Sequence, residues 1–307
     1  KTMVLRDVNV AIERGKTVGI IGESGCGKST LARVFAGLLP PSDGGLKLDG
    51  ESIAPDLRDR SREELRKVQF VYQMADTALN PRQRIKDIIG RPLEFYGGLT
   101  GDAKNRRLLE LLDMVELPPP FAERYPHELS GGQKQRVNLA RALAADPEVV
   151  LCDEVTSALD TIVGANVIEL LKTLRRDTGV SFVFISHDLS TVASFADEIV
   201  VLYAGRVAEQ GPTDKVLSPP YHPYTRLLIS SVPEMRTGWL EDTIASKETI
   251  TGMSGGVELT DTGCPFFARC PLAIEGTCDT QAPPRRIDGD DHVIECHREV
   301  DELLGGG

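Results

Sequence analysis

Short apolar runs alternate in this chain with segments in which apolar residues recur at every third or fourth position. Runs rich in β-branched residues occupy residues 18–21, 68–72, 148–153 and 180–185. Such runs are typical of parallel strands that are buried on both faces. We therefore expect an α/β fold in which these strands belong to one sheet.

The first run leads directly into GESGCGKST at residues 22–30, which fits the pattern G-x-x-x-x-G-K-[ST] at every fixed position. Four apolar residues then recur at helical spacing: Leu31, Val34, Phe35 and Leu38. In a strand–loop–helix unit of this kind, backbone N–H groups and the helix N-terminus attract the phosphates of a nucleotide. Lys28 would add a point charge, and the Ser29 hydroxyl could coordinate Mg²⁺. The predicted ATP-binding residues are Gly22, Glu23, Ser24, Gly25, Cys26, Gly27, Lys28, Ser29 and Thr30.

Side chains suited to phosphate hydrolysis follow the other predicted strands. One strand ends in Asp153 and Glu154, of which Asp153 is placed to hold Mg²⁺ through water and Glu154 to polarise the attacking water. His187 follows another strand and could sense the γ-phosphate, whereas Gln73 follows a third and could reach Mg²⁺ or the water. Because ligands of open α/β sheets collect at the carboxyl ends of strands, we expect these residues in one site.

The segment LSGGQ at residues 129–133 predicts a second helix N-terminus that can bind an anion. Ser130 is a favourable N-cap, and Gly131 and Gly132 let the backbone approach an anion closely. The following residues 133–145 favour a helix. Since the chain already has one phosphate loop, this segment makes sense if it contacts a nucleotide held by another domain.

These segments, in this order, resemble the motifs of the ATP-binding-cassette (ABC) family over about residues 3–215. The resemblance implies that residues 22–30 are the Walker A loop, Gln73 the Q-loop, Asp153 and Glu154 the end of Walker B, and His187 the switch histidine. SALD at residues 157–160 places Asp160 in the D-loop. Mg²⁺ would be held by Ser29, Gln73 and Asp153. Two departures are that Val155 replaces the usual Pro and that the aromatic residue stacking on adenine is expected before residue 1.

In that family, ATP on one cassette is covered by the signature segment of a second. The resemblance therefore implies that Ser130, Gly131, Gly132 and Gln133 contact ATP bound to a partner cassette, identical or not. It also implies a RecA-like P-loop core with an antiparallel β subdomain and an inserted helical subdomain at about residues 80–145. Together these would form a nucleotide-binding domain of residues 1–215. An apolar stripe at residues 102–117, comprising Leu108, Leu109, Leu111, Leu112 and Val115, belongs to the helical subdomain.

Two further segments are similar to the oligopeptide/dipeptide subfamily of importer ATPases. MADTALNPR ends at Arg82, and HPYTRLL lies within residues 219–233, where Pro223 suits the first turn of a helix. The resemblance implies an ATPase subunit that lies at the cytoplasmic face of the membrane and powers the import of peptides or similar small solutes. Its partners would be a second cassette, two transmembrane permease subunits and, indirectly, an extracytoplasmic solute-binding protein.

Four cysteines gather in the predicted C-terminal extension, residues 216–307: Cys264, Cys270, Cys278 and Cys296. Thiols this dense in an otherwise cysteine-poor chain favour metal ligation over disulfides. Zinc sites usually contain a C-x-x-C knuckle, which is absent, and four thiolates also suit an iron–sulfur cluster. GCPFFARCPLA resembles the extension of the same subfamily, some members of which carry a [4Fe-4S] cluster. We therefore expect a structural cluster that staples a loop-rich extension, with Zn²⁺ or unligated thiols as alternatives.

Composition narrows the remaining alternatives. The chain has 307 residues, of which 41% are hydrophobic, and a formal net charge of −11. This acidic balance argues against non-specific binding to nucleic acid, which requires a basic face. No apolar run approaches the roughly 18 residues of a membrane span. A soluble cassette ATPase acting on nucleic acid or ribosomes, and a redox-gated ATPase module, remain as the other hypotheses.

Overall fold

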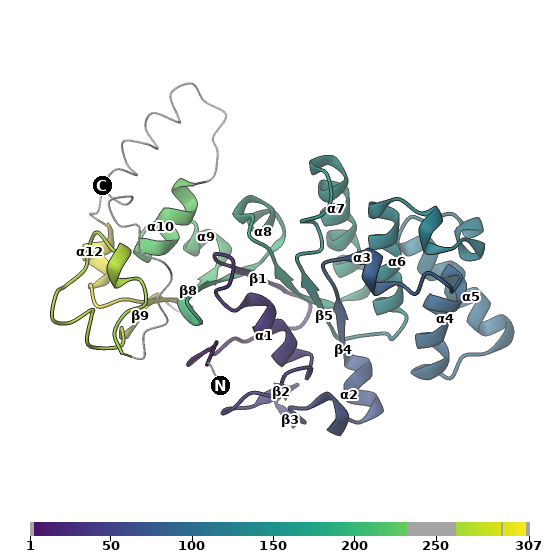
Figure 1. The fold of residues 1–307 in the computed structure, drawn as a ribbon, viewed down its shortest axis with the longest axis horizontal. Helices are drawn as coiled ribbons and strands as arrows, with labels where there is room; N and C mark the ends of the chain where they lie inside the picture. Colours follow the sequence, from purple (N-terminus) through teal and green to yellow (C-terminus); the bar gives the residue numbers. More distant parts are fainter. Residues whose placement is uncertain (1–2, 232–261, 290, 305–307) are drawn as a thin grey trace. The chain divides into compact units, whose positions relative to one another are not determined.

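The computed structural model describes residues 3–231, 262–289 and 291–304, which form two compact units (Figure 1). Within these ranges, unit 1 comprises residues 3–11, 18–28, 187–231, 262–289 and 291–304, and unit 2 comprises residues 12–17 and 29–186. The predicted division at residues 215 and 216 stays a prediction. Val232 and Pro233, the end of the segment that contains HPYTRLL, lie outside the described residues.

Unit 2 contains three parallel strands in the order β4 (Val68–Val71), β5 (Val149–Asp153) and β6 (Ser181–Ile185). All of β6 and nearly all of β5 are buried, as their continuous apolar sequences require. Helix α7 (Thr161–Thr178) connects β5 to β6 and ends at Gly179, whose φ of 70° is left-handed. The strands agree with the predicted ones to within one residue at each end.

A group of helices in unit 2 lies between β4 and β5 in sequence. It contains α3 (Ala75–Ala78), α4 (Ile85–Phe95), α5 (Gly101–Met114) and α6 (Gly131–Leu143). Helix α4 packs against both α5 and α6 (Figure 1). The predicted helix at residues 102–117 is too long, because the backbone turns at Glu116 with a φ of 56°. Leu109 was also wrongly assigned to the apolar stripe, since 44% of it is exposed.

The rest of unit 2 is a small antiparallel hairpin with flanking helices. Strands β2 (Leu46–Leu48) and β3 (Glu51–Ile53) pair with each other, and α1 (Lys28–Phe35) and α2 (Arg62–Lys67) stand before and after them in sequence. The predicted helix after the phosphate loop ends before Leu38, which is exposed, because Gly37 turns the chain with a φ of 74°.

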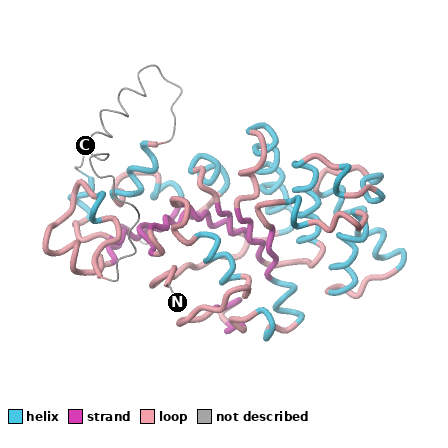
Figure 2. The backbone as a smooth tube through the Cα atoms, viewed as in Figure 1, coloured by secondary structure: helices cyan, strands magenta, loops and turns pink. Residues whose placement is uncertain are grey.

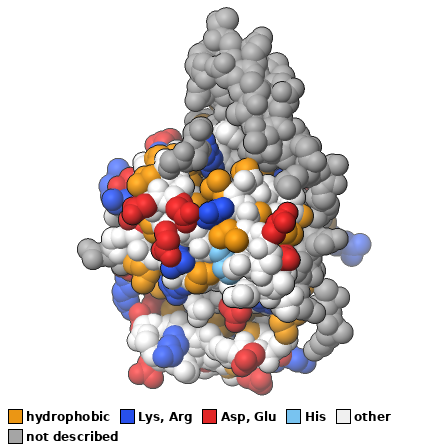
Figure 3. Space-filling model, turned by 90° about the vertical axis from the view of Figure 1, so that its left-hand side faces the viewer, with side chains coloured by type: hydrophobic (Ala, Val, Ile, Leu, Met, Phe, Trp, Pro, Cys, Tyr) orange, Lys and Arg blue, Asp and Glu red, His pale blue; other side chains and the backbone are white. Residues whose placement is uncertain are grey.

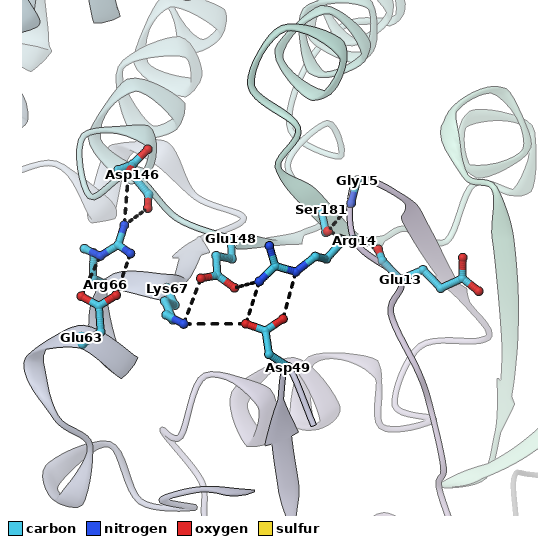
Figure 4. A network of polar contacts seen from close by, with 10 residues as sticks. All are labelled: Glu13, Arg14, Gly15, Asp49, Glu63, Arg66, Lys67, Asp146, Glu148 and Ser181. Atoms are coloured by element: carbon cyan, nitrogen blue, oxygen red, sulfur yellow. Dashed lines mark hydrogen bonds and ion pairs between the residues drawn. The ribbon is translucent and has the colours of Figure 1, made fainter. Parts of the chain in front are cut away.

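A ring of four charged side chains, of which two are exposed and two half-buried, connects the hairpin of unit 2 to the residue before β5 (Figure 4). Arg14 contacts both Asp49 at 2.8 Å and Glu148 at 3.3 Å, and Lys67 contacts Glu148 at 3.0 Å. The Lys67 ammonium also lies 3.7 Å from Asp49. Alternating charges hold together segments that are distant in sequence, although exposed pairs of this kind contribute little to stability.

Unit 1 contains a mixed sheet. Strand β1 (Thr17–Ile21) is parallel to β7 (Glu198–Tyr203), which is followed across the sheet by antiparallel β8 (Arg206–Pro212), β10 (His292–Glu295) and β9 (Arg285–Asp288). Its helices are α8 (Leu189–Phe195), α9 (Thr213–Val216), α10 (Pro223–Ser230) and α12 (Val300–Leu304). Pro223 begins α10, as predicted.

The described part of the C-terminal extension is only partly loop-rich. Loops predominate in residues 262–284 (Figure 2), interrupted by a short 3-10 helix, η4 (Phe267–Arg269). Strands β9 and β10, which the sequence reasoning missed, extend the sheet at β8. Figure 3 shows acidic and basic side chains lying among apolar ones on one face of the molecule. The C-terminal extension contains the ion pairs Arg286–Glu299 and Arg298–Glu302.

Candidate functional site

The phosphate-loop sequence forms a tight turn between β1 and α1. All five residues of β1 are buried, and α1 begins at Lys28, so the predicted order of strand, loop and helix is confirmed. Gly22 must be glycine, because a Cβ atom there would stand 2.1 Å from the Leu202 carbonyl oxygen. Gly25 and Gly27 both have positive φ angles, 83° and 111°, that other residues rarely adopt.

The lysine of this loop is turned inward. Lys28 is only 6% exposed, and its ammonium donates hydrogen bonds to the carbonyl oxygens of Gly22 at 2.7 Å and Glu23 at 3.0 Å. The Cys26 thiol is buried beside it, with Sγ 4.0 Å from Nζ, and this burial raises the pKa of Cys26. Cys26 therefore acts as a small packed side chain within the loop.

A serine hydroxyl and a buried carboxylate meet in unit 2. The Ser29 hydroxyl donates a hydrogen bond to Asp153 Oδ1 at 3.1 Å, although 124 residues separate the two in sequence. Asp153 is buried at the end of β5. Hydroxyl and carboxylate oxygens are the donors that Mg²⁺ prefers, with phosphate and water completing its coordination. The pair therefore fits the predicted role in holding this ion.

The next residue, Glu154, is half-buried and has a left-handed backbone, with a φ of 51°. Its N–H donates to the Ile185 carbonyl oxygen at 3.0 Å. The Ser157 hydroxyl donates to the Glu154 carbonyl oxygen at 2.9 Å, and the Gln73 amide nitrogen donates to the Ser157 hydroxyl oxygen at 3.1 Å. Gln73 and Glu154 are thus linked through Ser157, a residue whose role the sequence reasoning did not recognise.

The signature segment caps a helix in unit 2. Ser130 Oγ accepts a hydrogen bond from the Gln133 N–H at 3.4 Å, and Gln133 Oε1 accepts one from the Ser130 N–H at 3.0 Å. Ser130 is the N-cap of α6, as predicted, and the helix begins at Gly131, where this capping box pairs backbone N–H groups of the first turn. Asp160 similarly caps α7, since its Oδ1 accepts a hydrogen bond from the Val163 N–H at 3.0 Å.

The remaining predicted residues are an exposed histidine and four cysteines. His187 lies at the start of the loop that connects β6 to α8. Cys264, Cys270, Cys278 and Cys296 are free thiols in unit 1. The pKa of Cys264 is raised to about 11 and that of Cys270 to about 12, mainly by burial, and the other cysteines contribute in the same direction.

The four thiols are neighbours, but their arrangement in the described structure is not that of a metal site. Over residues 3–231, 262–289 and 291–304, no three His, Cys, Asp or Glu side chains are arranged to hold a metal ion. The predicted stapling of the extension by a cluster is therefore not supported. In the same ranges no helix has the length and apolar character needed to span a membrane.

The glycine loop between a strand and a helix and the Ser29–Asp153 pair are features of P-loop nucleotide-binding proteins, and comparison with known proteins narrows this class. The ABC transporter family model matches residues 5–157, and the model for the oligopeptide/dipeptide transporter C-terminal region matches residues 208–278. The chain therefore belongs to the ABC transporter ATPases and carries the C-terminal region of the oligopeptide/dipeptide type.

Individual relatives are similar over most of their length. A putative peptide import ATP-binding protein of Brucella abortus is 43% identical over 94% of this chain and 85% of its own length. The di/tripeptide transport ATP-binding protein DppF of Pseudomonas aeruginosa is 39% identical over 98% of this chain and 91% of its own.

Solved structures show the same fold. A dimeric ATP-binding cassette bound to ADP and phosphate in a post-hydrolysis state is 35% identical, with a TM-score of 0.59 over 68% of this chain and 90% of its own. A Clostridium perfringens protein that is part of an ABC transporter complex has a TM-score of 0.66 at 26% identity, over 79% of this chain and 92% of its own.

Proposed function

We propose that this chain is the ATP-hydrolysing subunit of an importer that moves di- or oligopeptides, or similar small solutes, across the cytoplasmic membrane. The observation that carries the proposal is the Ser29–Asp153 contact beside a P-loop sequence, in a chain that matches the oligopeptide/dipeptide C-terminal region. Relatives named as peptide import or di/tripeptide transport ATP-binding proteins support the solute class.

We assign the following roles in hydrolysis. Lys28 and the loop N–H groups of residues 22–30 bind the phosphates of ATP, and Ser29 and Asp153, with Gln73, would hold Mg²⁺. Mg²⁺, when bound, supplies charge neutralisation to those phosphates. Glu154 acts as the general base toward water. His187 stays assigned to the γ-phosphate.

The signature segment, Ser130 to Gln133, is proposed to cover ATP bound to a second cassette, with Asp160 near that interface. The capped start of α6 supports this role, because its first N–H groups lie at an exposed helix N-terminus that suits an anion. The dimeric cassette among the similar structures supports the pairing. Binding of ATP would close the two cassettes, and hydrolysis would reopen them. This motion would drive two transmembrane subunits, which receive the solute from an external solute-binding protein.

The test of the hydrolytic role compares two carboxylate variants in the assembled complex. Glu154→Gln should bind ATP but lower the ATPase rate by about 100-fold or more, because it removes the general base. Glu169→Gln is the matched control, since this exposed glutamate on α7 pairs only with Lys172 in the described structure and should leave the rate unchanged. A parental rate in Glu154→Gln would show that the base is another residue.

The transport role is tested by purification from the native membrane. We expect the chain to copurify with integral membrane proteins and to support ATP-dependent peptide uptake after reconstitution. Copurification with nucleic acid or ribosomes would favour the soluble alternative instead. A dependence of the ATPase rate on the oxidation state of the cysteines would favour the redox-gated alternative.

The [4Fe-4S] cluster, with Zn²⁺ as the alternative, remains a proposal that rests on four neighbouring thiols. The thiols of Cys264, Cys278 and Cys296 all raise the pKa of Cys270, after the larger effect of burial. Iron, sulfide and zinc analysis of anaerobically purified protein tests it. If neither iron nor zinc is found in stoichiometric amount, Cys264, Cys270, Cys278 and Cys296 are unligated thiols.

A further inference from the structure

Glu23 lies inside the phosphate loop, and all of its polar groups are engaged within unit 1. Its N–H donates to the Tyr224 hydroxyl oxygen at 2.8 Å, and its carbonyl oxygen accepts from Lys28 Nζ at 3.0 Å. Its carboxylate accepts from Arg269 Nη1, which lies 2.9 Å from one oxygen and 3.0 Å from the other. Tyr224 and Arg269 both belong to the C-terminal region of the chain, so this region contacts the phosphate loop at one residue.

Arg269 is also held in place by contacts other than the one with Glu23. Its guanidinium lies over the rings of Tyr203 and Phe266, at 5.8 Å and 5.7 Å from their centroids, and it donates to the Tyr203 hydroxyl at 3.3 Å. These rings form a buried cluster with Tyr224, whose centroid is 4.5 Å from that of Tyr203 and 5.5 Å from that of Phe266. The arginine is therefore positioned by packing, which lowers the entropic cost of its ion pair.

The ion pair between Arg269 and Glu23 matters for nucleotide binding because Glu23 is negatively charged. A carboxylate in a loop that binds phosphates repels them, because like charges at short range are unfavourable in a partly buried site. Only 20% of the Arg269 side chain and 33% of the Glu23 side chain are exposed, so water screens the pair incompletely. Arg269 neutralises this charge and also holds the residue whose carbonyl oxygen receives the Lys28 ammonium.

We propose that Arg269 and Tyr224 are positioning residues for ATP binding: they hold Glu23, neutralise its carboxylate and thereby keep Lys28 and the loop N–H groups ready for phosphate. The proposal rests on the proposed ATP site of residues 22–30. It adds to that function a dependence of ATP affinity on the C-terminal extension. The arginine lies between Cys264 and Cys270, whose segment is fixed by hydrogen bonds from the Phe267 N–H to the Cys264 carbonyl oxygen and from the Cys270 N–H to the Phe267 carbonyl oxygen.

The test measures Mg-ATP affinity by calorimetry in full-length Glu154→Gln protein, in which turnover does not interfere. Binding by this parent is the check on the proposed function itself. Arg269→Ala should then weaken ATP binding by about tenfold or more, as loss of a charged hydrogen bond and an uncompensated carboxylate predict. In the hydrolysing protein the same substitution should raise KM while leaving kcat nearly unchanged, because the uncompensated carboxylate acts on binding.

A second substitution separates charge compensation from mere loss of structure. Adding Glu23→Gln to Arg269→Ala removes the repelling charge and should restore most of the affinity. Glu23→Gln alone should bind ATP at least as tightly as the parent, and this outcome does not require Arg269→Ala to fold. Tyr224→Phe should weaken binding less, since it removes one neutral hydrogen bond and keeps the ring packing.

Arg298→Ala is the matched control, because Arg298 lies in the same extension and its guanidinium contacts Glu302 at 3.0 Å and the Leu272 carbonyl oxygen at 2.9 Å instead of Glu23. It should leave ATP affinity at the parental value. The positioning role of Arg269 is refuted if the parent binds ATP and Arg269→Ala binds it equally well. It is also refuted if Glu23→Gln fails to rescue a folded Arg269→Ala, or if Arg298→Ala weakens binding to the same degree.

Discussion

His222 is a buried histidine that must be uncharged to accept a hydrogen bond at the start of a helix. It is buried at the start of α10, where its Nδ1 accepts a hydrogen bond from the Tyr224 N–H at 3.0 Å. Burial lowers the pKa of His222 to about 4. A protonated ring would lose the acceptor and place a charge in the core, so the folded chain resists protonation at this position.

This shift makes stability depend on pH in a defined direction. Between about pH 6.5 and about pH 4 the unfolded chain binds a proton at His222 and the folded chain does not, so acidification lowers the free energy of unfolding. His222→Asn keeps a capping oxygen without a titrating group. We expect the loss of stability between pH 7 and pH 5 to be smaller in this variant by roughly 2 kcal/mol. Equal pH dependence in chemical denaturation would contradict the assignment.

At the scale of elements, the junction of α6 and α7 explains one glycine of the signature segment without reference to nucleotide. A Cβ atom on Gly132 would stand 2.6 Å from Val163 Cγ1, whereas one on Gly131 would meet only Leu159 Cδ2 at 3.5 Å, an ordinary contact. The β-branched valine has little freedom to move aside in a helix. Gly132 is thus required by packing as well as by any approach to an anion.

The two adjacent glycines therefore form a matched pair of substitutions. Gly132→Ala should destabilise the folded chain by about 1–3 kcal/mol through overpacking. Gly131→Ala should have no such cost, because alanine favours the helix and finds room there. Thermal unfolding would compare the two, and Val163→Ala should restore stability to Gly132→Ala but not improve Gly131→Ala. Equal effects of both glycine substitutions would exclude steric crowding at Val163.

At the scale of the molecule, the extension joins the sheet of unit 1 through a buried polar centre. Glu209 on β8 accepts a hydrogen bond from the His222 N–H at 2.8 Å, and its other carboxylate oxygen lies 2.7 Å from His292 Nε2 on β10. Burial raises the pKa of Glu209, against the opposing effect of His292. One carboxylate therefore connects three segments that are far apart in the chain.

Removal of one partner should reveal how much this centre contributes. His292→Ala leaves the Glu209 carboxylate buried beside a cavity and should cost about 3–5 kcal/mol of unfolding free energy. His297→Ala is the control, because the ring of this half-buried histidine contacts the Gln281 carbonyl oxygen, at 3.0 Å, and not Glu209. A His292→Ala variant as stable as His297→Ala would show that β10 does not depend on the pair.

Local sequence was sufficient for the buried parallel strands and for the P-loop. Apolar runs predicted β1 and β4 to β6, and the fixed spacing of glycines, lysine and serine predicted the strand, loop and helix. The errors were at Leu38, where a turn at Gly37 ends the helix, and at Leu109, which lies within α5 but on its exposed side. Strands β9 and β10 escaped prediction because they are short and gain their stability from pairing with β8.

The sequence by itself determined the chemistry, because phosphate binding requires a contiguous loop with particular residues at particular spacings. The tertiary structure decided which distant residues meet: Ser29 with Asp153, Gln73 with Ser157, and Arg269 with Glu23 across 246 residues of chain. No local pattern encodes such pairs, since each depends on the packing of whole elements. For the same reason, only the folded chain shows the C-terminal extension in contact with the phosphate loop.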